Sequence, residues 1–404
     1  MRIRCWIPAG LALLWCSAAA AQDPQAAVER GRYLADAGNC FSCHTQAGGK
    51  PYAGGVPFET PFGTLYSTNI TPDRETGIGR WSVADLRRAL HEGVAPDGSR
   101  LFPAFPYPSY TKITDADVAD IYAYLRTIAP VKSSAPRNGW MFSQRWTLRL
   151  WNAMFFEPGR FVPNPQQPAE WNRGAYLVEG LGHCGACHTP RDSFMSEIAE
   201  QAHQGGEMTE LLDGSKSRRW SAVNLTSASN GLAAWSVDDL TRYLHKGVSR
   251  RAGTFGPMNE VIVNSLMKLE AADVRAMAVY LKSLPPRGEY TGEPSTPEVA
   301  GAGADLYEEH CEECHGESGR GGMFGGPPLA GSAIVLADDP ASLLNVILHG
   351  PQIPKSVNFG QWETMKGYGA ALSDAEVAAV ANYVRGSWKN RARALTPEEV
   401  TRQR

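Results

Sequence analysis

Three short stretches of the 404-residue sequence combine thiol and imidazole side chains at a fixed spacing: "CFSCH", "CGACH" and "CEECH". The form C-x-x-C-H is typical of covalent haem attachment. On a helical turn the two thiols lie on one side, where they can add to the two vinyl groups of a haem, and the next residue offers an imidazole to the iron. The sequence therefore predicts three covalently bound haem c groups, attached at Cys40, Cys43, Cys184, Cys187, Cys311 and Cys314, with His44, His188 and His315 as iron ligands.

Two other interpretations of the cysteine pairs are weaker. A disulfide or a thioredoxin-like redox pair does not require a histidine after the second cysteine of all three pairs. A zinc site built from two pairs is disfavoured because the pairs begin at residues 40, 184 and 311, too far apart for a compact metal knuckle. Covalent haem attachment at all three motifs is the prediction that remains.

The sequence around the three motifs repeats, and the repeat predicts three domains. A short helical segment precedes each motif, and each repeat closes with an amphipathic helix: "TDADVADIYAYLRTI", "EAADVRAMAVYLKSL" and "SDAEVAAVANYVRGSW". Three positions match between the first two repeats, namely Asn69 with Asn224, Trp81 with Trp235, and His91 with His245. Helices before and after each motif, packed around a small cofactor, predict an all-α fold.

The predicted organisation has six parts. They are a signal peptide (residues 1–21), a first domain (22–135), an amphipathic linker (136–170), a second domain (171–291), a third domain (292–391) and a polar tail (392–404). Arg2 and Arg4, followed by an apolar run and small residues up to Ala21, indicate the signal peptide, which predicts a periplasmic mature chain. A net charge of -3 and a pI of about 6.3 give no electrostatic case for a nucleic-acid partner.

Four further stretches, "YSTNITPD", "GIGRWS", "GHCGACHTPRD" and "GGPPLAGS", together with the haem motifs, resemble the three-haem cytochrome c subunits of membrane-bound periplasmic dehydrogenases, of the alcohol and gluconate/sorbitol type. The resemblance runs over nearly the whole mature chain. It implies three tandem class I cytochrome c-like domains at the periplasmic side of the cytoplasmic membrane. It also implies an electron-transfer subunit without a substrate site of its own, which passes electrons from a flavin or quinoprotein dehydrogenase subunit to ubiquinone.

Two other functions remain open from the sequence. A multihaem peroxidase or similar oxidoreductase would work at an open haem and would turn over peroxide in isolation. A soluble electron carrier would deliver electrons to another cytochrome or to an oxidase, and it would not stay with the washed membrane fraction.

The sixth iron ligands are predicted from the family's ligand position in the loop after the second helix of each repeat. The stretch "TFGPMNEV" places Met258 at this position in the second repeat, and "WETMKGYG" places Met365 there in the third. A thioether opposite an imidazole is a known haem pairing that raises the reduction potential. The first repeat has Phe105 at the same position, and a phenyl ring has no lone pair to give to iron.

The sixth ligand of the first haem is therefore left open. The alternatives are no sixth ligand at all, or one supplied by Tyr107, Tyr110, His91, Met141 or Met154. A tyrosine would have to bind as phenolate, and the repeat partners of His91 lie beside haems that already have a methionine. We predict a first haem that is weakly ligated or five-coordinate and lower in potential than a haem with a methionine ligand.

The remaining histidines and three prolines carry weaker predictions. A surface or helix-end role is favoured for the repeated histidines, because a positive charge near a helix C-terminus is stabilising: His91, His245 and His349. No role is predicted for His183, His203 and His310. The family resemblance implies that the carbonyl that holds the proximal imidazole comes from a proline-shaped turn, at Pro190 in the second repeat and at Pro327 or Pro328 in the third.

The stretch "PRNGWMFSQRWTLRLWNAMFFEPGRF" between the first two repeats fits neither of them. As a helix over residues 139–157, it has an apolar arc made by Trp146, Leu148, Leu150, Trp151, Met154 and Phe155, with Arg145, Arg149 and Asn152 opposite. Two interpretations stay open: an interdomain helix with an ordinary core face, or a helix that lies in the membrane interface.

Overall fold

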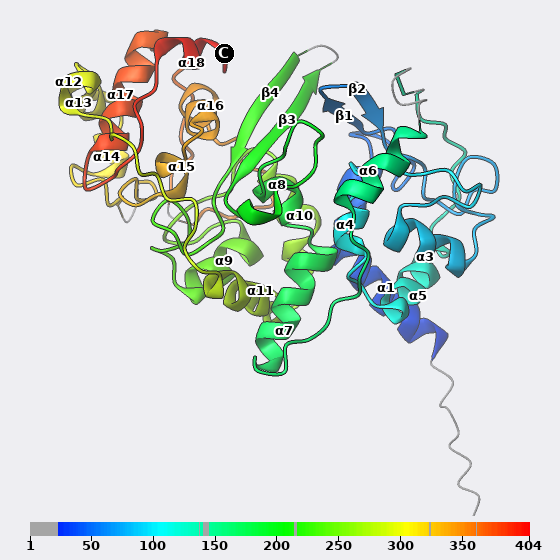
Figure 1. Cartoon of the computed structure of the whole chain (residues 1–404). Helices are drawn as coiled ribbons and strands as arrows, with labels where there is room; N and C mark the ends of the chain where they lie inside the picture. The colour runs from blue at the N-terminus through cyan, green and yellow to red at the C-terminus, as the bar shows by residue number, and fades with distance from the viewer. Residues whose placement is uncertain (1–22, 137, 140–144, 214–215, 323–324, 361) are drawn as a thin grey trace, which may run out of the picture.

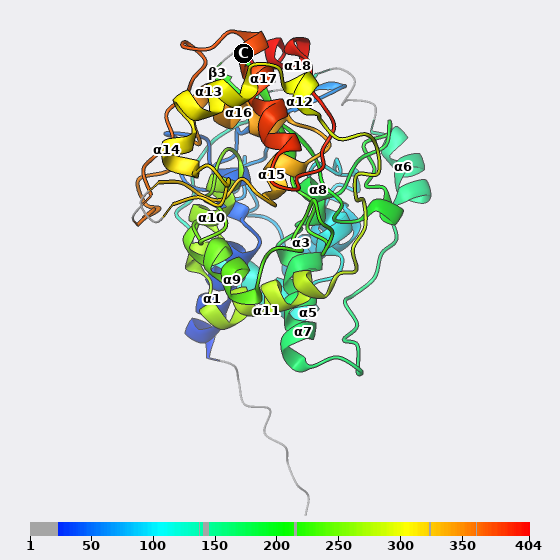
Figure 2. The same ribbon diagram turned by 90° about the vertical axis from the view of Figure 1, so that its left-hand side faces the viewer.

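The computed structural model describes residues 23–136, 138–139, 145–213, 216–322, 325–360 and 362–404 (Figure 1). The predicted signal peptide lies outside this range. Three largely helical units follow one another along the chain, and we name them unit one (residues 23–135), unit two (171–291) and unit three (292–404). Figure 2 shows unit three above the other two, with the linker helix at one edge of the molecule.

Unit one contains α1 (Pro24–Ala37), α2 (Cys40–His44), β1 (Pro57–Thr60), β2 (Gly63–Tyr66), α3 (Val83–Glu92), α4 (Tyr107–Tyr110) and α5 (Asp115–Leu125). The linker contains α6 (Thr147–Phe155). Unit two contains α7 (Ala169–Tyr176), the π-helical turn η2 (Leu177–Leu181), α8 (Gly185–His188), η3 (Ala199–Gln201), β3 (Gly206–Asp213), β4 (Lys216–Ala222), α9 (Val237–Lys246), α10 (Met258–Asn264), η4 (Leu266–Lys268) and α11 (Ala271–Ser283). Unit three contains α12 (Pro297–Ala300), α13 (Gly303–His310), α14 (Glu312–His315), α15 (Ala333–Leu336), α16 (Ala341–His349), α17 (Asp374–Gly386) and α18 (Pro397–Thr401).

In each unit the helix before the haem motif crosses the closing helix at a glycine. The crossing pairs are α1 with α5, α7 with α11, and α13 with α17. A methyl group at the crossing glycine would overlap a backbone oxygen of the closing helix, at 1.8 Å for Gly31, 1.9 Å for Gly174 and 2.2 Å for Gly303. A residue without Cβ lets the two backbones approach this closely, so the same helix pair is built in all three units.

The predicted closing helices are confirmed, and two of the three, α5 and α17, begin at a side-chain cap. Thr114 caps α5 and Ser373 caps α17, each accepting a hydrogen bond from the backbone N–H three residues later. The helices α3 and α9 begin with matching capping boxes at Ser82 and Ser236, and both end at a glycine in the left-handed conformation. The sequence repeat is therefore also a repeat of helix starts and stops.

The prediction of an all-α fold is incomplete, because the structure contains two antiparallel hairpins. One pairs β1 with β2 in unit one, and the other pairs β3 with β4 in unit two. Both hairpins follow a haem motif, in stretches for which the sequence predicted no regular structure. The hairpin of unit two lies between its neighbours, with β3 beside β1 and β4 against α16 (Figure 1).

Buried apolar side chains form two clusters in the described residues. The larger cluster joins units one and two, with Val118 of α5 and Val178 of η2 among its members. The second cluster lies within unit three and includes Val377 of α17 and Val400 of α18. Residues 392–404 are therefore not the expected polar tail, because their helix α18 packs against the core of unit three. Units one and two share a core, whereas unit three has its own.

The linker helix is shorter than the predicted 139–157, since α6 spans Thr147–Phe155. The expected position of Asn152 is also wrong, since the sequence placed this residue on the exposed polar side of the helix. Asn152 is buried instead, and its side-chain oxygen accepts a hydrogen bond of 2.5 Å from Tyr107 of unit one. Arg145 donates to the side chain of Ser99 and lies over the ring of Phe102, with its guanidinium carbon 5.4 Å from the ring centroid. The helix α6 is therefore fixed on unit one.

Candidate functional site

The three haem-attachment motifs end on the short helices α2, α8 and α14. Cys184 and Cys311 are the residues directly before α8 and α14. The six motif cysteines form no disulfides, so their thiols are available for thioether bonds. Burial raises the pKa of Cys40, Cys43 and Cys184 to about 12. A thioredoxin-like pair needs a thiol with a lowered pKa, so the structure disfavours that interpretation. Within the described ranges, no three His, Cys, Asp or Glu side chains are grouped as a metal site would require.

All three motif histidines place Nδ1 against a backbone carbonyl. The pairs are His44 with Thr68 at 2.7 Å, His188 with Val223 at 2.7 Å, and His315 with Pro327 at 2.8 Å. A carbonyl can only accept, so Nδ1 carries the proton and Nε2 keeps its lone pair. Burial lowers the pKa of His188 to about 4, which leaves this ring neutral at pH 7. A neutral imidazole, held by one nitrogen and with the other unprotonated, suits a haem-iron ligand.

The carbonyl partners confirm one prediction and correct another. In unit three the carbonyl belongs to Pro327, as the resemblance implied. In unit two it belongs to Val223 rather than to the turn at Pro190. Val223 corresponds to Thr68 of unit one, because each directly precedes the asparagine of the repeat. The β3–β4 hairpin lies between Pro190 and Val223 in the sequence, which hides this correspondence.

The repeated asparagine fixes the loop that carries the carbonyl. Asn69 donates from Nδ2 to the backbone oxygen of Val131 at 2.7 Å, and Asn224 donates in the same way to Arg287 at 2.7 Å. Both asparagines also accept a hydrogen bond from the backbone N–H two residues later. Val131 and Arg287 follow the closing helices α5 and α11, so the asparagine ties the proximal loop to the end of its own unit.

Glycines pack directly against two of the motifs. A methyl group at Gly326 would lie 2.9 Å from Cε1 of His315, and one at Gly325 would lie 2.2 Å from the backbone oxygen of Cys314. In unit two, a methyl group at Gly206 would lie 2.4 Å from the backbone oxygen of Cys187. Unpaired thiols, oriented neutral histidines and backbone this close to the motif fit a covalently attached haem.

The predicted sixth-ligand segments differ between the units. Met258 is the first residue of α10 and packs, partly buried, against the core that units one and two share. Met365 is partly buried in the irregular segment before α17. In unit one, Phe105 packs against the same shared core, and its ring centroid lies 5.5 Å from that of Tyr110. Met258 and Met365 therefore remain predicted ligands, and Phe105 remains a residue that has no atom to bind iron.

Two tyrosines considered for the first haem have other partners. Tyr107 donates to Asn152, and Tyr110 donates to the backbone oxygen of Gly38 at 3.0 Å. Burial raises the pKa of both hydroxyls above the ordinary value, so both remain neutral phenols. A tyrosine binds haem iron as phenolate, and this environment opposes that form.

The prediction that His91 carries a positive charge at a helix end is wrong. His91 is 1% exposed at the end of α3, and its Nδ1 lies 3.6 Å from Oδ1 of Asp115. Burial and the nearby Arg160 lower the pKa of His91 to about 4, so the ring is neutral at pH 7. Burial also lowers the pKa of His245 and of His349.

Of the methionines considered as ligands of the first haem, Met154 is exposed on α6 and Met141 lies outside the described residues.

Sequence reasoning missed a buried polar network beside the second motif. Glu179 of η2 accepts hydrogen bonds from His203 at 2.7 Å, Tyr280 at 2.8 Å and Lys112 at 3.0 Å. Burial would raise the pKa of the Glu179 carboxyl, but these partners outweigh it and hold that pKa well below its usual range. Tyr280 could have been singled out as a polar residue in register within the closing helices. His203 has no repeat partner in the sequence that would have indicated it.

Replacing Glu179 by glutamine is expected to lower the free energy of unfolding by roughly 1.5–3 kcal/mol at pH 7, the usual scale for hydrogen bonds to a charged group. A carboxyl whose pKa is depressed in the folded state stabilises the fold above its unfolded pKa of about 4.3 and stops doing so as the pH falls towards the folded pKa. Denaturant unfolding at several pH values should therefore show the deficit at pH 7 and a smaller one below about pH 4. The matched control is Glu75→Gln, at an exposed carboxyl paired with Lys132.

Two family models match the chain. The model described as Cytochrome c matches residues 28–129, and the model described as Cytochrome C oxidase, cbb3-type, subunit III matches residues 298–384. These ranges fall in units one and three and include their haem motifs. Together with the glycine-crossed helices and the carbonyl-held histidines, they define a cytochrome c with covalently bound haem.

Curated relatives cover nearly the whole chain. The alcohol dehydrogenase (quinone) cytochrome c subunit of Gluconacetobacter polyoxogenes is 40% identical over 423 residues, which cover 100% of this chain and 90% of that protein. The gluconate 2-dehydrogenase cytochrome c subunit of Pantoea cypripedii is 40% identical over 403 residues, with coverage of 94% and 90%. One of the subunits of nicotinate dehydrogenase from Pseudomonas putida is 44% identical over 369 residues, 89% of this chain but only 30% of that protein's length. The chain belongs to the family of cytochrome c subunits of dehydrogenases.

Proposed function

We propose that this protein carries three covalently bound haem c groups, one in each of three tandem cytochrome c domains. In this proposal it relays electrons from the large subunit of a periplasmic dehydrogenase, a flavoprotein or quinoprotein, to ubiquinone. The observation that carries the proposal is the threefold recurrence of one arrangement: an attachment motif whose histidine is held by Nδ1 on a backbone carbonyl. The names of the relatives, which are cytochrome c subunits of dehydrogenases, support the choice of partner.

The haem, when bound, supplies one-electron redox chemistry, and the residues of the chain hold it and set its environment. The motif cysteines provide the attachment and the motif histidines the proximal ligand. Met258 and Met365 would be the sixth ligands in units two and three, where a thioether favours the reduced iron. In unit one Phe105 gives no such ligand, and the first haem is then open or weakly ligated.

The exposed side of α6 supports a membrane contact on the periplasmic side of the cytoplasmic membrane. Trp146, Leu150 and Met154 are 68%, 59% and 52% exposed, although all three are large apolar residues. Phe194 of unit two is 58% exposed and extends the same surface, since its ring centroid lies 5.6 Å from that of Phe155. We call these side chains the α6 patch. In the described part of the chain, no helix has the length and apolar character needed to cross a bilayer. A contact along the interface, with the exposed Arg149 near anionic headgroups, fits the patch.

Replacing Trp146, Leu150 and Met154 by serine is expected to reduce binding to anionic liposomes at least about tenfold, since three large apolar side chains are lost from the interface. The haem absorption spectrum should not change, because these side chains point away from the unit cores. Flotation with vesicles of known composition measures the binding. A matched control replaces Val83, Val162 and Val299, which are exposed but lie outside the α6 patch. Equal flotation of the two variants would limit α6 to an interdomain role.

Purification from the native membrane tests the proposed relay. We expect a large dehydrogenase subunit to copurify with the chain, and the complex to reduce a ubiquinone analogue when the substrate of that subunit is added. A protein that is found only in the soluble fraction and reduces another cytochrome instead would be a carrier, and the proposal would fail.

A second candidate function rests on Phe105. An iron without a sixth ligand could react with peroxide, so a peroxidase-like activity at the first haem is the alternative. Turnover of hydrogen peroxide by the isolated protein, abolished by Phe105→Met, would favour this function over the relay alone.

A further inference from the structure

Units one and two are joined by hydrogen bonds that come in exchanged pairs. Tyr33 of unit one donates to Asp273 at the start of the closing helix of unit two, at 2.6 Å. Tyr176 of unit two donates to Asp117 at the start of the closing helix of unit one. Tyr33 and Tyr176 each lie two residues after the crossing glycine of their units, and Asp117 and Asp273 are each the third residue of α5 or α11. The same two positions of the repeat therefore meet twice, with their units exchanged.

The ion pairs of this interface follow the same exchange. Lys268 of unit two lies 3.1 Å from a carboxylate oxygen of Asp36 in unit one. Lys112 of unit one lies 3.0 Å from a carboxylate oxygen of Glu179 in unit two. Each lysine lies two residues before the N-cap of the closing helix in its own unit. Each acidic partner lies three residues after the tyrosine of its own unit, Asp36 after Tyr33 and Glu179 after Tyr176. Reciprocal contacts of this kind are the mark of a two-fold, isologous interface.

The two-fold arrangement brings each sixth-ligand segment to the other unit's haem motif. Asn264, the last residue of the helix that begins with Met258, donates to Ser42 inside the motif of unit one at 2.9 Å. Tyr110, five residues after Phe105, places its ring centroid 5.6 Å from that of His183, which directly precedes the motif of unit two.

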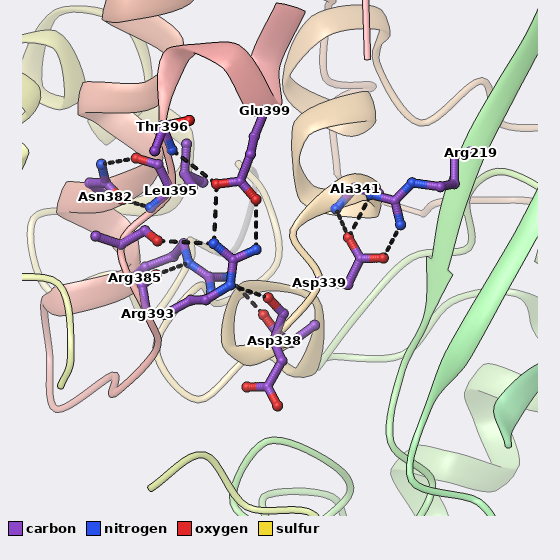
Figure 3. A network of polar contacts seen from close by, with 12 residues as sticks. Arg219, Asp338, Asp339, Ala341, Asn382, Arg385, Arg393, Leu395, Thr396 and Glu399 are labelled. Carbon is purple, nitrogen blue, oxygen red and sulfur yellow. Dashed lines mark hydrogen bonds and ion pairs between the residues drawn. The ribbon is translucent and has the colours of Figure 1, made fainter. Parts of the chain in front are cut away.

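Unit three is attached in a different way. Arg219 of β4 pairs with Asp339, just before α16, and Figure 3 shows this contact between the hairpin and unit three. Ser221 of β4 and Ser342 of α16 exchange hydrogen bonds of 3.0 Å and 2.7 Å nearby. These contacts use the hairpin of unit two, which has no part in the tyrosine and lysine pairs, and unit three has a separate core.

We infer that units one and two form an internal pseudo-two-fold pair that holds the first and second haems next to each other, so that they exchange electrons directly, while the third haem stands outside this pair. The inference rests on the proposed function, since it requires haem at the first two motifs. An electron passing between the two leaves one iron ferric and makes the other ferrous, and no proton moves. The residues that set the pair are the two tyrosines, the two lysines and their four carboxylate partners.

Iron-edge anomalous diffraction from crystals of the holoprotein tests the arrangement. We expect the irons of units one and two to be nearest neighbours, exchanged by the rotation that exchanges Tyr33 with Tyr176. An iron of unit one that lies nearer to the iron of unit three than to that of unit two overturns the inference. The same data count the irons, so a missing third iron would refute the proposed three-haem relay without touching the pair.

Hydrogen exchange in solution tests the interface with matched variants. Lys112→Met together with Lys268→Met removes both exchanged ion pairs, and we expect faster exchange in α1 of unit one and in η2 of unit two alike. The control Lys132→Met removes a lysine of the exposed pair with Glu75, away from the interface, and should leave both segments unchanged. Faster exchange in one unit alone, or in neither, contradicts a two-fold interface.

Discussion

A protein in which Cys184 and Cys187 are both replaced by alanine is expected to lose one of the three haems that we propose, and the stability of units one and two should fall together. The second motif lies beside the core that these two units share. Without the haem that we propose at this motif, that core would lose the apolar contacts of the porphyrin ring. We expect the melting temperature of the shared core to fall by about 10 °C or more, since several kcal/mol are lost from a structure of this size. Haem absorbance per chain and thermal unfolding followed by circular dichroism measure the two effects.

The matched variant replaces Cys311 and Cys314 by alanine. It should also lose one haem, but its effect should stay within unit three, because the core of unit three is a separate cluster. Hydrogen exchange resolves the difference, with α5 and α11 exposed in the first variant and α17 in the second. If both variants destabilise the same segments, the division into a shared core and a separate one is wrong.

Replacing Phe105 by methionine is expected to give the first haem a thioether ligand. The midpoint potential of this haem should then rise by on the order of 100 mV, a modest part of the ~0.8 V range that axial ligands span. A high-spin signal of the parent protein in low-temperature spin-resonance spectra should disappear in the variant. The physical reason is that the thioether stabilises the ferrous iron and completes its coordination.

Phe105→Leu is the control for this experiment. It removes the ring that packs against Tyr110 but supplies no ligand, so it should change packing without raising the potential or removing the high-spin signal. Three indistinguishable low-spin signals in the parent protein would contradict the prediction, because the first haem would then already have a strong sixth ligand.

Local signals in the sequence predicted the parts of the site that depend on local geometry. The proposed attachment cysteines and proximal histidines come from a five-residue motif, and the structure confirms a short helix, α2, α8 or α14, at each of these motifs. The closing helices were predictable because caps and amphipathic spacing act within a few residues. The crossing glycines repeat in the sequence as well, although their role is visible only where two backbones meet.

The failures involve contacts between distant residues. The carbonyl that holds His188 belongs to Val223 and not to the predicted turn at Pro190. The sequence did not indicate this contact because a hairpin lies between the motif and Val223. Asn152 was placed on the exposed side of its helix because the sequence does not show that Tyr107 of another element would bind it. His91 lost its expected charge through burial against α5, and burial is a tertiary property.

The sequence contains part of the information on how units one and two pair, since Tyr33 and Tyr176 occupy the same position of the repeat. A repeat alone does not say how its copies pack. The pairing becomes visible only when each tyrosine is seen to bind the other unit's closing helix.

The most direct measurement for the whole account is a haem count combined with a reductive titration of the purified, fully matured chain. We predict three haems per chain by pyridine haemochrome, all retained on a denaturing gel because thioether bonds survive denaturation. We also predict three one-electron steps, of which the lowest belongs to unit one and moves upward in Phe105→Met. Two or fewer haems per chain, or three haems that cannot be reduced by a quinone-linked dehydrogenase, would contradict the proposal of a three-haem relay.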